Sequence, residues 1–319
     1  MDPLKHTFGP VPSRRLGQSL GIDPIPSKTC NWNCAYCQLG RSIPLCHERR
    51  EYFPLQEILA DLDQSLEKHA AAAIDWITIV GSGEPTLYEP LDQLVGGIRT
   101  RSNLPLAVIT NGSMLYLPAV REALLQTDLV MPSLDAGTAG LYKRLNRPHP
   151  QATFARLIEG MVHFRRDYTG EIWLEVMLVA GCNDTESALQ EIAARIHEIR
   201  PDKVHLNLPV RPPAEEWVTS PGPESVERAM RILGNAAVIV PPAAGEFSLD
   251  AEDLIETLLT IVMRHPMSEI ELVQTLRNRG LEPEKILPQL EKNPRLQVVE
   301  RNGQRFWTAG TAHFPEPKP

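Results

Sequence analysis

The sequence predicts an α/β protein in which a parallel sheet carries helices on its outside, followed by a smaller C-terminal unit. Short apolar runs alternate with amphipathic stretches from about residue 19 to residue 208, the order expected of successive βα units. A proline-rich segment follows, and beyond residue 248 the pattern changes to closely spaced helices and a hairpin. Periodicity alone leaves a doubly wound sheet and a partial barrel open. In both folds ligands gather at the carboxyl ends of the strands.

Composition indicates an ordinary globular protein. The chain has 319 residues, of which 42% are apolar, and a net charge of −8. No N-terminal apolar segment is present, and no apolar run approaches the ~18 residues of a membrane span. We therefore expect no membrane association, and the odd number of cysteines predicts a reducing cytoplasm. The negative charge argues against broad electrostatic binding to nucleic acid.

The predicted sheet begins with a strand at residues 21–25, which runs directly into a loop that contains cysteines. Pro54 then opens a helix, because proline is favoured in the first helical turn. Further strands are expected at 76–80, 106–109, 129–131, 172–179 and 203–208. Helices are expected around 88–101, 118–126, 138–145, 153–167 and 185–199, with a last helix and strand over 224–240.

The smaller unit carries two local signals. Ser268 and Glu271 match a capping box, which predicts a helix start. Asn302-Gly303 between two apolar runs predicts a two-residue hairpin turn. Three helices followed by a hairpin resemble a winged helix. Helices are expected at 250–264, after Ser268 and at 282–291, and the strands of the hairpin at 296–299 and 305–308. The sequence thus divides into a first domain at 1–240 and a second at 248–310, with a connector at 241–245.

Three cysteines in one short loop carry the main chemical signal. Their spacing is Cys30-x3-Cys34-x2-Cys37, and three thiolates can hold three corners of a [4Fe–4S] cluster while the fourth iron stays open. An electron carrier of the ferredoxin type would need a fourth cysteine at a position where this chain has none. The alternative is structural zinc, for which only Cys46 and His47 lie near enough to complete four ligands.

The spacing, with Tyr36 before the last cysteine, resembles the radical S-adenosylmethionine (radical SAM) superfamily. The resemblance implies a partial (β/α)6 TIM-type barrel, a [4Fe–4S] cluster on the three cysteines, and S-adenosylmethionine bound to the open iron. It implies an enzyme that cleaves this cofactor reductively to a 5′-deoxyadenosyl radical, which abstracts hydrogen from a substrate. Residues 8–17 resemble a group of Fe–S oxidoreductases loosely related to the wyosine synthases, which modify tRNA.

A glycine-rich motif follows the second predicted strand. Gly83 and Glu84 stand in Gly-Ser-Gly-Glu-Pro, which resembles the Gly-Gly-Glu motif of the superfamily, although Ser82 replaces one glycine. The resemblance implies that the backbone and carboxylate here accept hydrogen bonds from the methionine ammonium of the cofactor. The alternative is a structural turn.

Polar residues at the ends of the next strands complete the predicted cofactor site. Asn111 is a candidate for a polar contact, and Ser133 and Asp135 suit the ribose hydroxyls. By analogy with the superfamily, Tyr36 is expected to pack near the adenine. A turn at Asn111, capping by Ser133 or Asp135, and simple packing of Tyr36 are the alternatives.

Four further residues carry weaker signals. Glu175 lies in an otherwise apolar strand, and strand alternation predicts that it faces the pocket. Asn207 is a similar case in the next strand. We expect Arg14 and Arg15 to form a surface pair, with contact to a phosphate or carboxylate as the alternative.

The expected partners follow from charge and from the resemblance. The smaller unit has slightly more acidic than basic residues, whereas a DNA-reading domain is expected to be basic. We therefore expect it to dock a protein or peptide or to cover the barrel, with RNA contact through Arg295, Arg301 and Arg305 as the alternative. The resemblance implies a reductant such as flavodoxin or ferredoxin. Two other functions stay open: an Fe–S sensor that regulates transcription through the winged helix, and a wyosine-type RNA-modifying enzyme.

Overall fold

The structure is a computed structural model that describes residues 6–70, 73–234, 237–240, 247 and 254–314. Its main body is an eight-stranded sheet whose strands lie in chain order. The strands are β1 (Thr7–Ser13), β2 (Gly17–Ile22), β3 (Trp76–Ile79), β4 (Leu106–Thr110), β5 (Leu129–Pro132), β6 (Glu171–Met177), β7 (Lys203–Asn207) and β8 (Ala237–Ile239).

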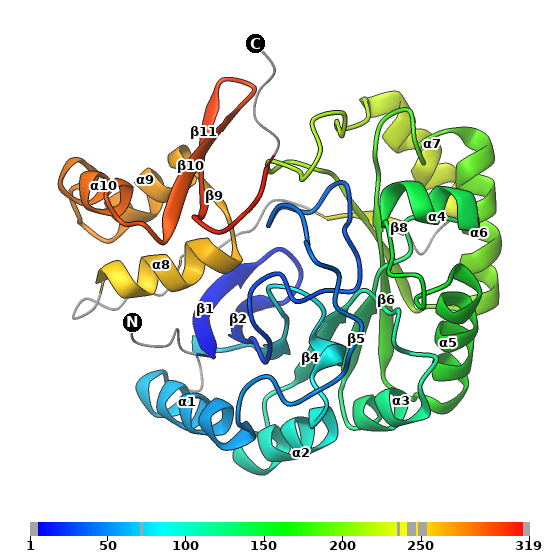
Figure 1. The fold of residues 1–319 in the computed structure, drawn as a ribbon, viewed down its shortest axis with the longest axis horizontal. Coiled ribbons are helices and arrows are strands. Elements are labelled where there is room, and N and C mark those ends of the chain that lie inside the picture. Colours follow the sequence, from blue (N-terminus) through cyan, green and yellow to red (C-terminus); the bar gives the residue numbers. More distant parts are fainter. Residues whose placement is uncertain (1–5, 71–72, 235–236, 241–246, 248–253, 315–319) are drawn as a thin grey trace.

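The sheet is parallel from β2 to β8, and β1 is added to its edge as an antiparallel hairpin partner of β2. The helices follow the outer side of the curved sheet (Figure 1). This is the mixed α/β class that the sequence predicts, and it is consistent with a partial barrel. The helices of the body are α1 (Leu55–Lys68), the 3₁₀ turn η2 (Pro85–Leu87), α2 (Leu91–Arg101), α3 (Pro118–Leu124), α4 (Ala139–Leu145), α5 (Phe154–Asp167), α6 (Glu186–Ile199) and α7 (Pro223–Leu233).

The first hairpin differs from the expectation of a single strand at 21–25. β2 ends at Ile22, and β1 was not predicted because Pro10 and Pro12 interrupt its strand pattern. Proline is tolerated on an edge strand, where one row of N–H groups has no partner strand. The extra strand places the β1–β2 turn, which contains Arg14 and Arg15, beside the main sheet.

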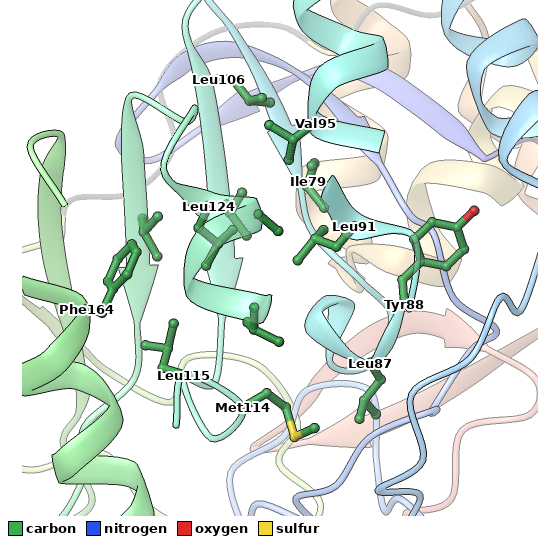
Figure 2. Packing of buried hydrophobic residues seen from close by; sticks show 14 of the residues in the cluster. Ile79, Leu87, Tyr88, Leu91, Val95, Leu106, Met114, Leu115, Leu124 and Phe164 are labelled. Carbon is green, nitrogen blue, oxygen red and sulfur yellow. The ribbon is translucent and has the colours of Figure 1, made fainter. Parts of the chain in front are cut away.

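The main core lies between the sheet and its outer helices. Ile79 of β3 and Leu106 of β4 pack with Leu91 and Val95 of α2, and all four are fully buried (Figure 2). Burial of each such side chain stabilises the fold by about 1.5–3 kcal/mol. Because the helices cover the outer face, the strand ends and the loops that follow them are left to form a site.

The C-terminal unit, residues 254–314, forms a three-stranded sheet in the order β10-β11-β9 beside three helices. The capping box of Ser268 and Glu271 is confirmed, and so is the hairpin turn, in which Asn302 and Gly303 have φ of 50° and 71°. The elements are α8 (Leu254–Arg264), β9 (Met267–Ser268), α9 (Glu269–Asn278), α10 (Pro283–Glu291), β10 (Leu296–Arg301) and β11 (Gln304–Ala309).

The winged-helix identity of this unit and the domain division at 240 and 248 stay predictions. The expected connector at 241–245 and the first residues of the helix expected at 250–264 lie outside the described residues. In the described part of the chain, no helix has the length and apolar character that a membrane span needs.

The C-terminal unit packs against the first hairpin. Val11 of β1 belongs to the same apolar cluster as Leu258 and Val262 of α8. At the end of α8, Arg264 Nε lies 2.9 Å from Asp23 Oδ2, and the two side chains are 10% and 2% exposed. A buried ion pair of this kind is costly to break, because either partner alone would be an uncompensated charge. The contact therefore fixes the end of α8 near the strand ends.

Candidate active site

A cavity of about 380 Å³ lies at the carboxyl ends of the parallel strands. Its walls come from the β1–β2 turn, the cysteine loop, the segments that follow β3, β4 and β5, the ends of β6 and β7, and the beginning of the C-terminal unit. This is the position at which parallel α/β folds bind ligands.

Cys30, Cys34 and Cys37 all line this cavity. Backbone hydrogen bonds hold the loop: Ala35 N donates to Leu145 O at 2.8 Å, and Cys37 N donates to Cys34 O at 3.1 Å. Within the described residues, no three His, Cys, Asp or Glu side chains converge on a single ion site. The thiolates of a [4Fe–4S] cluster bind different iron atoms, so they do not have to converge on one ion.

The environment of the thiols fits a cluster. The ammonium of Lys28 lies 3.2 Å from Cys37 Sγ, and Trp32 N donates to Cys30 Sγ at 3.4 Å. Donors to sulfur stabilise the negative charge of a cluster and tune its potential. Burial raises the pKa of the Cys30 thiol to about 12, so the thiol is protonated at neutral pH unless a metal binds it.

Gly83 brings the glycine-rich segment against the start of the cysteine loop. Glu84 N donates to Thr29 O at 2.9 Å, and Lys28 N donates to Ser82 O at 2.8 Å. A Cβ at position 83 would lie only 1.9 Å from Thr29 O, so a side chain cannot be accommodated there without moving backbone. Glycine is therefore required for the close approach of the two loops, and Gly83 itself lines the cavity.

The Glu84 carboxylate lines the cavity and is 1% exposed. Its Oε1 accepts hydrogen bonds from Thr86 N at 3.0 Å and Thr110 Oγ1 at 2.6 Å, and its Oε2 accepts one from Asn111 N at 2.6 Å. Burial raises the pKa of Glu84, and these donors oppose that shift. Because Oε2 accepts one hydrogen bond within the described chain, it keeps acceptor capacity for a further donor.

Asn111 and Ser133 also line the cavity, at the ends of β4 and β5. The Asn111 amide donates to Asn31 Oδ1 at 2.8 Å and lies 3.8 Å from Cys30 Sγ. Ser133 forms an isolated bridge with Glu175 of β6. The structure thus brings both residues to the same space as the cysteines.

Asp135 and Tyr36 form a buried pair in which the Tyr36 hydroxyl donates to Asp135 Oδ2. The same carboxylate accepts bonds from Asn146 Nδ2 at 2.7 Å and Met177 N at 2.8 Å. Tyr36 lines the cavity, whereas Asp135 is 2% exposed and lies behind it. Asp135 therefore holds Tyr36 in place, and its predicted contact with ribose stays a prediction.

Of the other expected side-chain orientations, one pair is confirmed and one pair is wrong. Glu175 and Asn207 line the cavity, which confirms their predicted direction, and Asn207 Nδ2 donates to Glu175 Oε1 at 3.2 Å. The expectation of a surface pair at Arg14 and Arg15 is wrong. Both line the cavity, and Arg15 is 13% exposed and paired with Glu175. The turn between β1 and β2 turns inward because the unexpected strand β1 lies on the sheet edge.

Several residues of the site were not predicted from the sequence. Lys28 precedes the cysteines closely enough to have been suspected, but Asn146, Arg211, Arg264 and His265 come from distant segments. No spacing or motif links them to the cysteine loop. Only packing of the chain places them at this site.

The comparisons with known proteins agree with this geometry. A model of the Radical SAM superfamily matches residues 25–196, and the chain belongs to that superfamily. More particularly, it is similar to the UPF0026 protein MJ1312 of Methanocaldococcus jannaschii, with 34% identity over 94% of each chain. Membership indicates an enzyme, and the superfamily implies a [4Fe–4S] cluster and S-adenosylmethionine.

Two solved structures resemble the fold. A radical SAM methyltransferase from Sphaerobacter thermophilus has a TM-score of 0.53 and 20% identity, over 69% of this chain and 66% of that one. Native anSMEcpe with bound AdoMet has a TM-score of 0.52 and 19% identity, over 67% of this chain and 58% of that one. At these identities the likeness concerns the fold alone.

Proposed function

We propose that this chain is a radical SAM oxidoreductase or transferase whose cluster is held by Cys30, Cys34 and Cys37. The observation that carries the proposal is the presence of these three thiols and Glu84 on the wall of one cavity at the strand ends. When bound, the cluster and S-adenosylmethionine would supply reductive cleavage of the cofactor, which initiates hydrogen abstraction from a substrate.

The residues of the chain would position the cofactor. Gly83 and Glu84 would accept hydrogen bonds from its ammonium, through the backbone and through Oε2 of the carboxylate. Asn111, Ser133 and Tyr36 would contact the remainder of the molecule, and Asp135 would act on it through Tyr36 or on the ribose. Support comes from the shared cavity and from the hydrogen bonds that hold Glu84 in one orientation.

The C-terminal unit, which we propose to be of winged-helix type, would cover one side of the cavity and dock the substrate. Arg264 and His265, at and just after the end of α8, are part of the cavity wall, which supports this role. A small reductant such as flavodoxin or ferredoxin would supply the electron. A reducing compartment such as the cytoplasm suits both the cluster and the free thiols.

The test is anaerobic. Purified chain is reconstituted with iron and sulfide, reduced with dithionite and incubated with S-adenosylmethionine, and 5′-deoxyadenosine is quantified. We expect formation by the wild type, none by Cys34→Ala, and wild-type formation by the matched control Cys182→Ala, whose thiol lies outside the cavity wall. A reducible wild-type cluster that yields no 5′-deoxyadenosine would contradict the proposal, and salt-dependent binding to duplex DNA would then favour a sensor.

A further inference from the structure

The cavity wall includes four arginine side chains to which the proposed contacts of the cofactor assign no role. Arg14 and Arg15 come from the β1–β2 turn, Arg211 from the segment after β7, and Arg264 from the end of α8. Four guanidinium groups from three distant segments therefore face one cavity.

Two of these arginines are neutralised by carboxylates. Arg15 pairs with Glu175, and Arg264 pairs with Asp23 at 2.9 Å. Arg15 and Arg264 therefore have structural roles that need no ligand. They leave Arg14 and Arg211 to be accounted for.

Arg211 has only neutral partners in the described part of the chain. Its Nη1 donates to Gln38 Oε1 at 2.8 Å, and its Nη2 lies 2.5 Å from His265 Nε2. Burial, followed by the charges of Arg211 and Arg14, lowers the pKa of His265 well below 6.5, so the ring is neutral and accepts the hydrogen bond. Gln38 and His265 thus orient the guanidinium without neutralising its charge.

Arg14 forms no hydrogen bond and no ion pair among the residues that the structure describes, although it is half-buried. The carboxylate of Glu271 is near enough to favour the charged forms of Arg14 and Arg211. Glu271 Oε2 accepts hydrogen bonds from the backbone N–H and the hydroxyl of Ser268 in the capping box, and the carboxylate forms no ion pair with either arginine in the described chain. Burial lowers the pKa of Arg211 to about 10, so it remains a cation at neutral pH.

We propose that Arg14 and Arg211 form a recognition site for an oxyanion of the substrate, a carboxylate or a phosphate group. A guanidinium offers a planar fork of donors that fits two oxygens of such a group. The bound anion would supply a directly hydrogen-bonded counter-charge, which no carboxylate of the described chain provides to either arginine. The inference rests on the proposed function, since it assigns the substrate class of the same cavity.

Arg14 and Arg211 come from other segments of the chain than Glu84, which we propose to hold the ammonium of the cofactor. The carboxylate of S-adenosylmethionine is nevertheless a competing anion, so the test must separate cofactor from substrate. We would use reconstituted full-length chain saturated with S-adenosylmethionine and titrate it calorimetrically with inorganic phosphate and, separately, with succinate. The two probes distinguish a phosphate site from a carboxylate site.

We expect at least one probe to bind the wild type, and its Kd to rise about tenfold or more in Arg14→Gln and in Arg211→Gln. Arg195→Gln is the matched control, because Arg195 lies on α6 and pairs with Glu198 away from the cavity. The Kd of the probe for Arg195→Gln should equal its Kd for the wild type. Arg14→Gln removes no hydrogen bond of the described chain, so it should fold even where Arg211→Gln does not.

Three results would overturn the inference. Neither probe binds the wild type, or the two arginine variants bind the probe as tightly as the wild type does, or these variants lose as much affinity for S-adenosylmethionine as for the probe. The last result would assign the arginines to the cofactor. 5′-Deoxyadenosine formation is measured on the same wild-type sample. Its absence counts against the proposed function, whereas its presence without an anion effect counts against this inference alone.

Discussion

The Lys28 ammonium lies 3.2 Å from Cys37 Sγ and donates to Gly40 O at 2.7 Å. Lys28 has a left-handed backbone, with φ of 62°, in the turn just before the cysteines. This conformation is uncommon for a residue with a side chain. The side chain reaches across the loop and ties both ends of it together.

Replacement of Lys28 with Met should lower the midpoint potential of the cluster. A positive charge beside a sulfur ligand stabilises the reduced cluster, which carries more negative charge. Loss of one charge-assisted hydrogen bond of about 1.4 kcal/mol corresponds to about 60 mV for a one-electron couple. Potentiometric titration followed by electron paramagnetic resonance measures the shift. Lys28→Arg keeps the charge, so its midpoint potential should be close to that of the wild type. Equal midpoint potentials for Lys28→Met and the wild type would refute the electrostatic role of Lys28.

Gly83→Ala should impair cluster incorporation, because its Cβ would meet Thr29 O at 1.9 Å and push the glycine-rich segment away from the cysteine loop. Iron content after reconstitution and the thermal midpoint both report this change. Gly96→Ala is the matched control, since nothing lies within 4 Å of a Cβ there and it is inside α2. Alanine should stabilise that helix by up to about 1 kcal/mol. Similar iron content in both variants would show that the close approach is dispensable.

Glu84→Gln should weaken S-adenosylmethionine binding by about tenfold or more, since an amide cannot supply the charge that an ammonium prefers. The substitution also places an NH₂ group among donors from Thr86, Thr110 and Asn111, which we expect to cost about 1–3 kcal/mol of unfolding free energy. Calorimetric titration and urea unfolding measure the two effects. Glu227→Gln, on the exposed side of α7, serves as the control. Unchanged cofactor affinity would remove Glu84 from the site.

His205 should make the fold sensitive to acid. Burial, and then the charges of Arg15 and Lys203, lower the pKa of His205 from 6.5 to about 4. Between these two values the unfolded chain binds a proton that the folded chain does not. The free energy of unfolding should therefore decrease as the pH falls through this interval, by up to about 1.4 kcal/mol per pH unit.

His205→Gln removes this group, so its thermal midpoint should fall less than that of the wild type between about pH 7 and pH 5. Differential scanning calorimetry on matched preparations gives both midpoints. His197 is exposed on α6, so His197→Gln serves as a control that should keep the wild-type pH dependence. If His205→Gln also retained that dependence, other groups would be responsible for it.

Much of the fold could be predicted because its signals are local. The strand at Trp76–Ile79 and the helix at Glu186–Ile199 lie within a residue or so of the expected positions, since apolar periodicity decides both. The hairpin turn at Asn302-Gly303 could be predicted because asparagine and glycine both tolerate the positive φ that such a turn requires. β1 was missed because its prolines conceal a strand that exists through pairing with β2.

The sequence by itself determined the cysteine spacing, the order of strands and helices, and the strand-end residues Glu84, Asn111 and Ser133. Each depends on neighbours a few residues away, or on the rule that parallel strands end at one edge. Only the tertiary structure decided that Arg14 and Arg15 turn inward and that Arg211 meets His265, 54 residues later in the chain. Those contacts depend on how the first hairpin and the C-terminal unit pack together, and packing between distant segments leaves no periodic pattern in the chain.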